Sequence, residues 1–509
     1  MLQRTRENEG EVFEDFTGSK EYLQIHPGFE YMENSKWQCS SSYNEQSLPC
    51  ADLGEGSKSM EEKGNIDRIS ELPDALIHHI FSFLNIKNIL QTCILWRRYR
   101  YLWACLRTLR LSEHSMVCNT DDSFEALNRY IVFVDRLQLL RDSSSDIQTF
   151  ELKWKNVGNS LSDLDFKYKV TRHVATWIMA AVKHNIQELN LTMWLREMIK
   201  LPDCLFTCKS LTKLKFSGFS RNLTDFVLPH IPMYFPRLRY LALTGVSLGD
   251  ENLTSKLFSS CPVLESLVLT ECSIKFDFSS LSLKHFQLDN CDDVFICSKS
   301  PSLICKDYMS QDYSLENLSS LVTADIGMKV KELYGARMIK FRRAVSNVAD
   351  LTLSSPGFLE VVSGSLDSLG DPYFQFNNLR FLKVETWVSS NCMNAIAYLV
   401  RVSPNIESIC LTIEQKELNT NNPGGDCIVG SQFPCLHFLK FVQIQGIQGC
   451  LNELKFLQVL LNKAIVLEKV TLLCYKRDSS DRAAQLMEFK EMLLAFRSTS
   501  SSVSISMQL

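Results

Sequence analysis

A repeating pattern of apolar residues constrains the fold of this chain most strongly. The unit is L-x-x-L-x-L, with other apolar residues allowed, and most neighbouring copies lie roughly 25–31 residues apart. The last two apolar positions lie two residues apart, so they point to the same side of a short strand. One repeat cannot bury that side alone, and stacked repeats would bury it as a parallel sheet on the inside of a curved solenoid. The copies are Ile147/Phe150/Leu152, Ile186/Leu189/Leu191, Leu211/Leu214/Phe216, Leu238/Leu241/Leu243, Leu264/Leu267/Leu269, Leu283/Phe286/Leu288, Leu321/Ala324/Ile326, Val348/Leu351/Leu353, Leu379/Leu382/Val384, Ile406/Ile409/Leu411, Leu436/Leu439/Phe441 and Leu467/Val470/Leu472.

The segments between the copies support a leucine-rich-repeat solenoid. The sequences FPRL, CPVL and SPNI place a proline just before three copies, where it ends the returning segment. Cys272 and Cys291 each follow the last leucine of a copy by three residues, which is the Asn/Cys position of leucine-rich repeats. Val174, Ile178 and Ala181 recur at helical spacing, so a helix is expected before the Ile186 strand. The predicted class is α/β, a curved parallel sheet with helices and loops outside.

Residues 67–111 have the pattern of a small helical unit. Leu72-Pro73-Asp74 favours a helix start, because proline fits the first helical turn. A second helix is expected over about residues 87–93 and a third around Trp103. A unit of about 45 residues buries too little surface to stand alone, so exposed apolar side chains on it indicate a docking face for another protein. The first helix carries Leu76, Ile77, Ile80, Phe81 and Leu84, and the third carries Trp96, Tyr99, Leu102, Trp103 and Leu106.

The same stretch resembles a known family. DRIS-x-LP-D-x-L, then I-x-SFL, then an arginine and aromatic cluster ending in LW resemble the F-box of plant F-box proteins. F-boxes dock onto the Skp-type adaptor of a cullin–RING ubiquitin ligase, so the resemblance implies this adaptor, and through it a cullin, as partners. The residues that would face the adaptor or support that face are Leu72, Pro73, Leu76, Ile80, Leu84 and Trp103.

The resemblance continues along the chain. SFEALNRYIVFVDRLQLL and HVATWIMAAVKHNIQELNL resemble the first repeats of plant F-box proteins with leucine-rich repeats, and FPCLHFLKFVQIQGIQGCLNELKFLQVLLNKAIVLEKVTL resembles their closing FBD region. The C-terminal pattern predicts a strand, a glycine turn, a helix over about 452–463, a strand and a helix over about 482–496 that together cap the array. The expected organisation is a disordered tail (1–65), a three-helix F-box (66–111), the solenoid (112–430) and an FBD-like α/β cap (431–509).

Composition and motifs argue against several other classes. Hydrophobic content of 45%, charge of 22% and a net charge of −4 are ordinary for a globular protein and do not favour a polyanionic partner. No apolar run approaches ~20 residues and the N-terminus lacks a secretory signal. We therefore expect no membrane association, a location in the nucleus and/or cytoplasm, and 18 cysteines that remain thiols.

Sites for metals, cofactors, catalysis and nucleic acids are also not expected. No C-x-x-C pair occurs, and the adjacent His78 and His79 would point about 100° apart on a helix, which does not favour a shared metal. Phosphate-binding glycine loops and hydrolase motifs are missing, so we predict a chain that is not an enzyme and needs no cofactor. In the basic and aromatic stretch Trp96–Tyr101, Trp96 and Tyr99 share one helical face with Trp103, which favours a packed helix over a nucleic-acid site.

Strand positions that do not point inward form the candidate target-binding surface. Their mixture of charged, aromatic and small polar side chains suits a protein or peptide. The copy at Leu436 places Phe438 and Lys440 on this surface. The principal candidates are Lys213, Lys215, Tyr240, His285, Gln287, Asp289, Phe381, Lys383 and Glu385.

These expectations together predict the substrate-recognition subunit of an SCF-type (Skp–cullin–F-box) ubiquitin ligase. The F-box would dock on the Skp-type adaptor, and the solenoid would hold a target protein near the ubiquitin-transfer machinery, where tethering raises the effective concentration of target lysines. Two alternatives remain at this stage. One is an interaction scaffold that binds the adaptor without degradation, and the other is a receptor whose small-molecule ligand recruits the target.

Overall fold

The computed structural model describes most of the chain from Leu72 to Gln508. The predicted tail (1–65) and the Trp96–Tyr101 stretch lie outside the described residues. The described residues are 72–95, 102–113, 124–154, 164–194, 199–218, 224–274, 283–291, 300–306, 320–327, 343–355, 374–387, 389–414, 434–474, 480–495 and 503–508, with single positions or pairs between 276 and 363.

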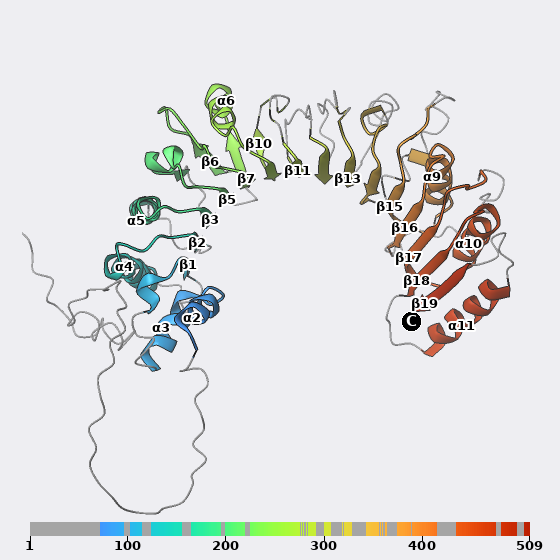
Figure 1. Cartoon of the computed structure of the whole chain (residues 1–509), viewed down its shortest axis with the longest axis horizontal. Coiled ribbons are helices and arrows are strands. Elements are labelled where there is room, and N and C mark those ends of the chain that lie inside the picture. Colours follow the sequence, from blue (N-terminus) through green and yellow to red (C-terminus); the bar gives the residue numbers. More distant parts are fainter. Residues whose placement is uncertain are drawn as a thin grey trace, which may run out of the picture.

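A 15-stranded parallel sheet lines the inner side of a horseshoe (Figure 1). Its strands follow one another in chain order, as expected when each repeat contacts only its neighbours. The fold therefore confirms the predicted α/β class and is consistent with a leucine-rich-repeat solenoid. The strands are β1 (Thr108–Ser112), β2 (Thr149–Trp154), β3 (Glu188–Met193), β5 (Lys213–Ser217), β7 (Tyr240–Thr244), β9 (Ser266–Thr270), β11 (His285–Asp289), β12 (Ser302–Lys306), β13 (Thr323–Gly327), β14 (Asp350–Leu353), β15 (Phe381–Thr386), β16 (Ser408–Ile413), β17 (Phe441–Ile447), β18 (Lys469–Cys474) and β19 (Ser504–Gln508).

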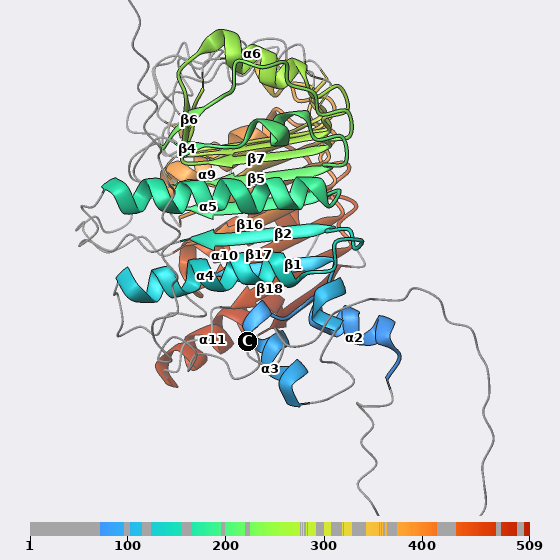
Figure 2. The same ribbon diagram turned by 90° about the vertical axis from the view of Figure 1, so that its left-hand side faces the viewer.

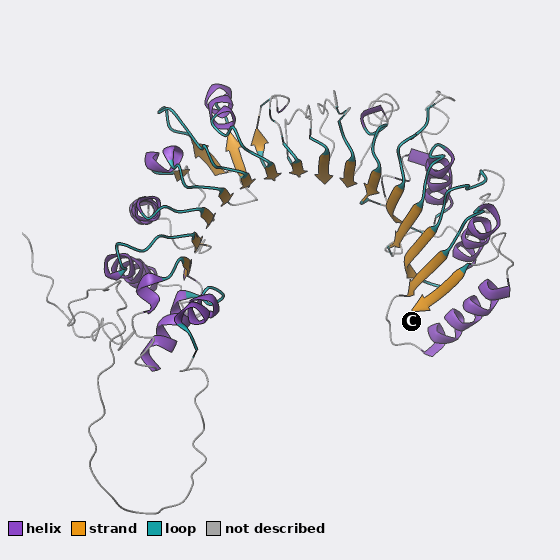
Figure 3. Cartoon of the chain, in the orientation of Figure 1, coloured by secondary structure: helices purple, strands orange, loops and turns teal. Residues whose placement is uncertain are grey.

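Helices and short strands form the outer layer (Figure 3). The second sheet has the order β10-β8-β6-β4 and comprises Ser273–Ile274, Val246–Leu248, Thr224–Val227 and Ile199–Lys200. Among the described helices, none combines the length and the apolar character needed to cross a bilayer. The outer helices are α4 (Phe124–Leu140), α5 (Leu164–Lys183), the 3-10 helix η5 (Asp203–Thr207), α6 (Glu251–Ser259), α9 (Ser390–Arg401), α10 (Leu451–Lys463) and α11 (Ser480–Ala495).

The apolar repeat accounts for the core between the two layers. In β5, for example, Leu214 and Phe216 are buried, whereas the intervening Lys215 is partly exposed. The cysteine positions also match the repeat, because the Cys272 thiol donates to the carbonyl of Leu243 at 3.3 Å. Cys291 donates to the carbonyl of Leu269 at 3.4 Å. Each thiol thus satisfies a buried carbonyl of the preceding strand, which explains part of the high cysteine content.

Strands β1 and β12 were not recognised from the sequence, although each carries a copy of the repeat. Leu106, Leu109 and Leu111 form a further copy of the repeat and create β1, so the sheet begins before the boundary expected after residue 111. In β12, Leu303 and Cys305 point inward and the buried Ser300 occupies the first apolar position. Because serine is polar, the L-x-x-L-x-L pattern does not identify this copy.

The predicted copy Leu436/Leu439/Phe441 is wrong by three residues. Strand β17 pairs Val442 with Ile409 and buries Val442 and Ile444, so its copy is Leu439/Val442/Ile444. Phe441 points to the concave side and is exposed. Phe438 and Lys440 consequently precede the strand and do not lie on the concave face.

The N-terminal helices pack on the first strand of the sheet (Figure 2). Helix α2 covers Asp74–Phe81 and α3 covers Ile86–Leu95, close to the two predicted helices. The described part of the third predicted helix is the 3-10 helix η3, Leu102–Cys105. Its buried Trp103 belongs to the same apolar core as the sheet, so the docking unit and the solenoid are continuously packed.

The C-terminal region has the predicted order of strand, glycine turn, helix, strand and helix. Gly446 and Gly449 adopt positive φ values of 84° and 80°, a backbone conformation that favours glycine. They connect β17 to α10, and the buried carboxylate of Glu453 in the first turn of α10 accepts the backbone N–H groups of Gln448, Gly449 and Cys450. A final strand, β19, was not predicted and extends the parallel sheet beyond β18.

Candidate functional site

Helix α2 presents a row of exposed apolar side chains. Leu76 and Ile80 lie four residues apart on one face and are 49% and 44% exposed. Phe83 follows the helix and is 69% exposed. Ile77 and Phe81 point to the other side and are buried in the core. We call the exposed set of Leu76, Ile80 and Phe83 the α2 face.

The other predicted F-box residues border or support the α2 face. Pro73 is exposed at the N-terminal end of α2, while Leu72 and Leu84 are partly buried against the core. Trp103 is buried, so it can support the α2 face and cannot itself contact a partner on the surface. Phe83 was missed as a candidate, although the SFL sequence contained it, because its position relative to the helix end could not be read from helical spacing.

The histidines of α2 do not alter this apolar character. Burial lowers the pKa of His78, which favours its neutral form. The ring of His79 contacts the Phe83 ring edge-on, with 5.0 Å between centroids. Across the described residues, no three His, Cys, Asp or Glu side chains come together as a metal site.

The second candidate surface is the concave face of the large sheet. All the predicted residues lie on strands with their side chains opposite to the buried ones, and all except the exposed His285 are partly exposed. They fall into three places along the sheet: Lys213, Lys215 and Tyr240 on β5 and β7; His285, Gln287 and Asp289 on β11; Phe381, Lys383 and Glu385 on β15. The structure therefore does not gather them into one cluster.

Near β5, two lysines share one aromatic ring. The ammonium groups of Lys213 and Lys215 lie 5.5 and 5.4 Å from the centroid of the Tyr240 ring. Lys213 also pairs with Glu188 at 3.8 Å. No carboxylate of the described residues pairs with Lys215, so this lysine offers its charge to the concave side.

Near β15, carboxylates predominate. Burial and, to a smaller extent, the nearby Glu414 raise the pKa of Glu385; Asp325 raises it further, whereas Lys383 and Lys306 oppose the shift. Asp325 pairs with Lys306 at 3.7 Å and also accepts a hydrogen bond from the Ser354 hydroxyl. Lys306 was not among the predicted residues because β12 was not recognised, whereas Asp325 and Asp350 lie on recognised copies and were not selected.

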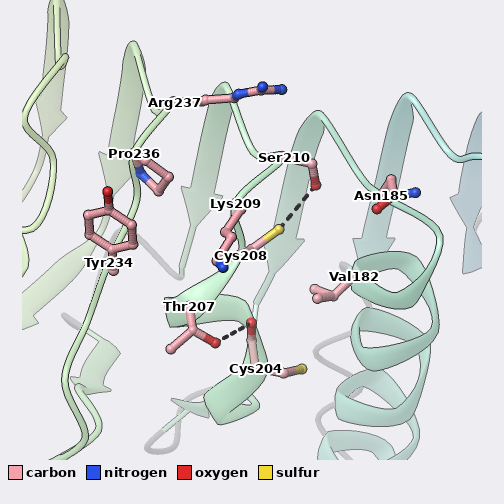
Figure 4. A pocket seen from close by; sticks show the side chains of 10 residues that line it. All are labelled: Val182, Asn185, Cys204, Thr207, Cys208, Lys209, Ser210, Tyr234, Pro236 and Arg237. Atoms are coloured by element: carbon pink, nitrogen blue, oxygen red, sulfur yellow. Dashed lines mark hydrogen bonds between the residues drawn. The ribbon is translucent and has the colours of Figure 1, made fainter.

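A cavity of about 660 Å³ lies between the C-terminal end of α5 and the segment before β7. Figure 4 shows Tyr234 and Pro236 on one side and Val182 and Asn185 on the other, with η5 between them. The Thr207 hydroxyl donates to the carbonyl of Cys204 at 3.3 Å. Burial raises the pKa of Cys204, which favours the unreactive thiol. The cavity therefore offers no activated nucleophile.

A curved parallel sheet with an exposed apolar helix face at one end is consistent with a leucine-rich-repeat solenoid, the fold of F-box/LRR proteins, which are non-catalytic adaptors. Residues 174–332 match the family described as "FBD-associated F-box protein At5g56370, LRR repeats". In this region the chain is similar to plant F-box proteins with FBD and leucine-rich-repeat regions.

Individual relatives extend this similarity over most of the chain. The F-box/LRR-repeat protein At4g14103 of Arabidopsis thaliana is 29% identical, with 69% of this chain and 92% of the relative covered. The FBD-associated F-box protein At1g66310 of the same plant is 23% identical, with 88% and 97% covered. The putative F-box/FBD/LRR-repeat protein At1g66300, also from this plant, is 24% identical, with 82% and 90% covered.

Proposed function

We propose that the chain is the substrate-recognition subunit of an SCF-type ubiquitin ligase. The α2 face would dock on a Skp-type adaptor, and the concave face would bind the target protein. The observation that carries this proposal is the exposure of Leu76, Ile80 and Phe83 beside a continuous core, in a chain similar to plant F-box/FBD/LRR proteins. Three large apolar side chains in one row favour a protein partner over water.

The proposed function also implies a division of the chain into domains. Residues 66–111 would form the F-box, with Leu72, Pro73 and Leu84 at the border of the docking face and Trp103 beneath it. The solenoid would follow, and residues 431–509 would form the FBD-like cap. In this arrangement the adaptor holds one end of the horseshoe, and the target is bound along its inner side (Figure 1).

A binding assay with purified Skp-type adaptor tests the docking half. We expect Leu76→Asp/Ile80→Asp to abolish binding, because a charge would be buried against the apolar partner. Both residues are exposed, so the variant should unfold at the same temperature as the wild type. Leu139→Asp is the matched control, since Leu139 on α4 is apolar and 83% exposed. Equal binding by the α2 variant and the control would refute the α2 face as the docking site.

A further inference from the structure

The concave face has a basic pole on its N-terminal half. We define this pole as Lys213 and Lys215 on β5, which flank Tyr240 on β7. Glu188 partly neutralises Lys213 at 3.8 Å, whereas Lys215 keeps its charge beside the aromatic ring. An acidic side chain of a partner can therefore pair with Lys215 without breaking an ion pair.

An acidic pole lies farther along the sheet. We define it as Glu385 on β15 and Glu414, which directly follows β16 and whose backbone N–H donates to the carbonyl of Thr386 at 2.9 Å. Lys383 is the cation on the same strand as Glu385. The ion pair between Lys306 and Asp325 at 3.7 Å is internally balanced. The pole consequently retains negative charge that a basic partner would neutralise.

A strip of mostly small or neutral side chains connects the two poles. Larger side chains (Tyr240, His285 and Phe381) stand at the first strand positions and border the strip on one side. A partner backbone can approach the sheet closely along small side chains, which suits an extended segment. The strip includes Ala242, Thr244, Val268, Thr270, Gln287, Ile304, Gly327 and Thr352.

We propose that the concave strip binds an extended segment of the target with an acidic end at the basic pole and a basic end at the acidic pole. This inference rests on the proposed function, which places target binding on the concave face. Strands β5 and β15 are seven places apart in the sheet, and a spacing of about 4.8 Å per strand gives about 34 Å. An extended chain covers this distance with about ten residues.

Synthetic fluorescent peptides of about 14 residues test the charge order. The bipolar peptide carries Asp-Glu at one end and Lys-Arg at the other, separated by a neutral spacer. A mixed peptide has the same composition with one acidic and one basic residue at each end. Fluorescence polarisation with the full chain should show about tenfold weaker binding of the mixed peptide, since each end then meets one repulsive contact.

Variants of each pole test which end of the bipolar peptide binds at that pole. Lys213→Ala/Lys215→Ala and Glu385→Gln/Glu414→Gln should each weaken bipolar binding about five- to tenfold. Lys209→Ala/Lys256→Ala is the matched control, because both lysines are exposed and line the outer cavities. In Glu385→Lys/Glu414→Lys both poles are basic, so this variant should prefer a peptide with acidic residues at both ends.

Adaptor binding by the same preparations separates the two proposals. If the chain binds the adaptor but binds the bipolar peptide no better than the mixed one, or binds neither, the bipolar segment is refuted and docking stands. If the bipolar preference and its dependence on both poles are observed without adaptor binding, the docking proposal fails and the bipolar recognition stands.

Discussion

Replacement of Glu453 by alanine should destabilise the C-terminal cap. The Glu453 side chain is 4% exposed and sits in the first turn of α10. Its Oε2 atom accepts the N–H of Gly449 at 2.7 Å and of Cys450 at 3.0 Å, and Oε1 accepts that of Gln448 at 3.0 Å. Alanine would leave these three donors without their acceptor at the point where the chain turns into the helix.

The expected loss is about 2–4 kcal/mol in the free energy of local unfolding. Each of the three hydrogen bonds to the charged carboxylate contributes about 1.5–3 kcal/mol to stability before the cost of desolvating that carboxylate is subtracted. Burial raises the pKa of Glu453 despite the opposing N–H donors, so desolvation of the carboxylate offsets much of this gain. Water can also reach the partly exposed residues 448–450 and replace some of the lost bonds.

Hydrogen exchange of the full chain, measured by mass spectrometry, reports the local stability of α10 and β17. A loss of 2–4 kcal/mol accelerates exchange about 30- to 700-fold in α10 and β17, while β5–β9 should not change. Glu453→Gln keeps the shape and one acceptor, so its effect should be smaller. Glu488→Ala, at an exposed position of α11, is the control. Exchange in α10 that stays within threefold of the wild type in Glu453→Ala would refute a net stabilising role of the carboxylate.

Three further predictions follow from single contacts. Cys272→Ala should cost about 1–3 kcal/mol of stability, measured by thermal unfolding, because it removes the hydrogen bond from the thiol to the carbonyl of Leu243 and creates a small cavity. Gly449→Ala should cost about 1–2 kcal/mol by the same assay, because φ is +80° and the added Cβ would lie 3.3 Å from Leu486. Since the pKa of Glu385 is raised, its carboxylate is lost as the pH falls through that raised value. Affinity for the bipolar peptide should therefore begin to decrease at a higher pH than an ordinary glutamate would cause, and Glu385→Gln should flatten this dependence in the polarisation assay.

The sheet could be predicted from the sequence because its physical cause is local. Two inward residues separated by one outward residue define a strand and its buried side, as in Leu214-Lys215-Phe216. The prediction failed where two copies overlap, since Leu439 can be the second residue of one copy or the first of the next. Only pairing with the neighbouring strand, which aligns Val442 with Ile409, decides between them.

The candidate surfaces could be predicted only in part, because they depend on contacts between repeats. Helical spacing identified Leu76 and Ile80 together with Ile77 and Phe81, but tertiary packing decides which pair is buried. Lys306 on β12 was missed because the polar Ser300 stands at the first apolar position of that copy. Recognition of the two poles required the strand order, which places residues 213 and 385 on one continuous face.

Continuous packing between α2 and the sheet bears on how the proposed adaptor would work. Trp103 and Leu106 bury their side chains in the core shared with Leu109 of β1, and the backbone N–H of Gln148 donates to the carbonyl of Arg107 at 2.7 Å. Ile77 and Phe81 of α2 belong to the same core, so the described part of this helix is packed together with the first strand of the sheet. A target bound at the two poles would be held at a fixed direction from the adaptor, and the reach of its lysines would depend on the curvature of the solenoid. A rigid connection raises the effective concentration only when the geometry matches the transfer site, so the same feature that increases transfer to one target would discriminate against others.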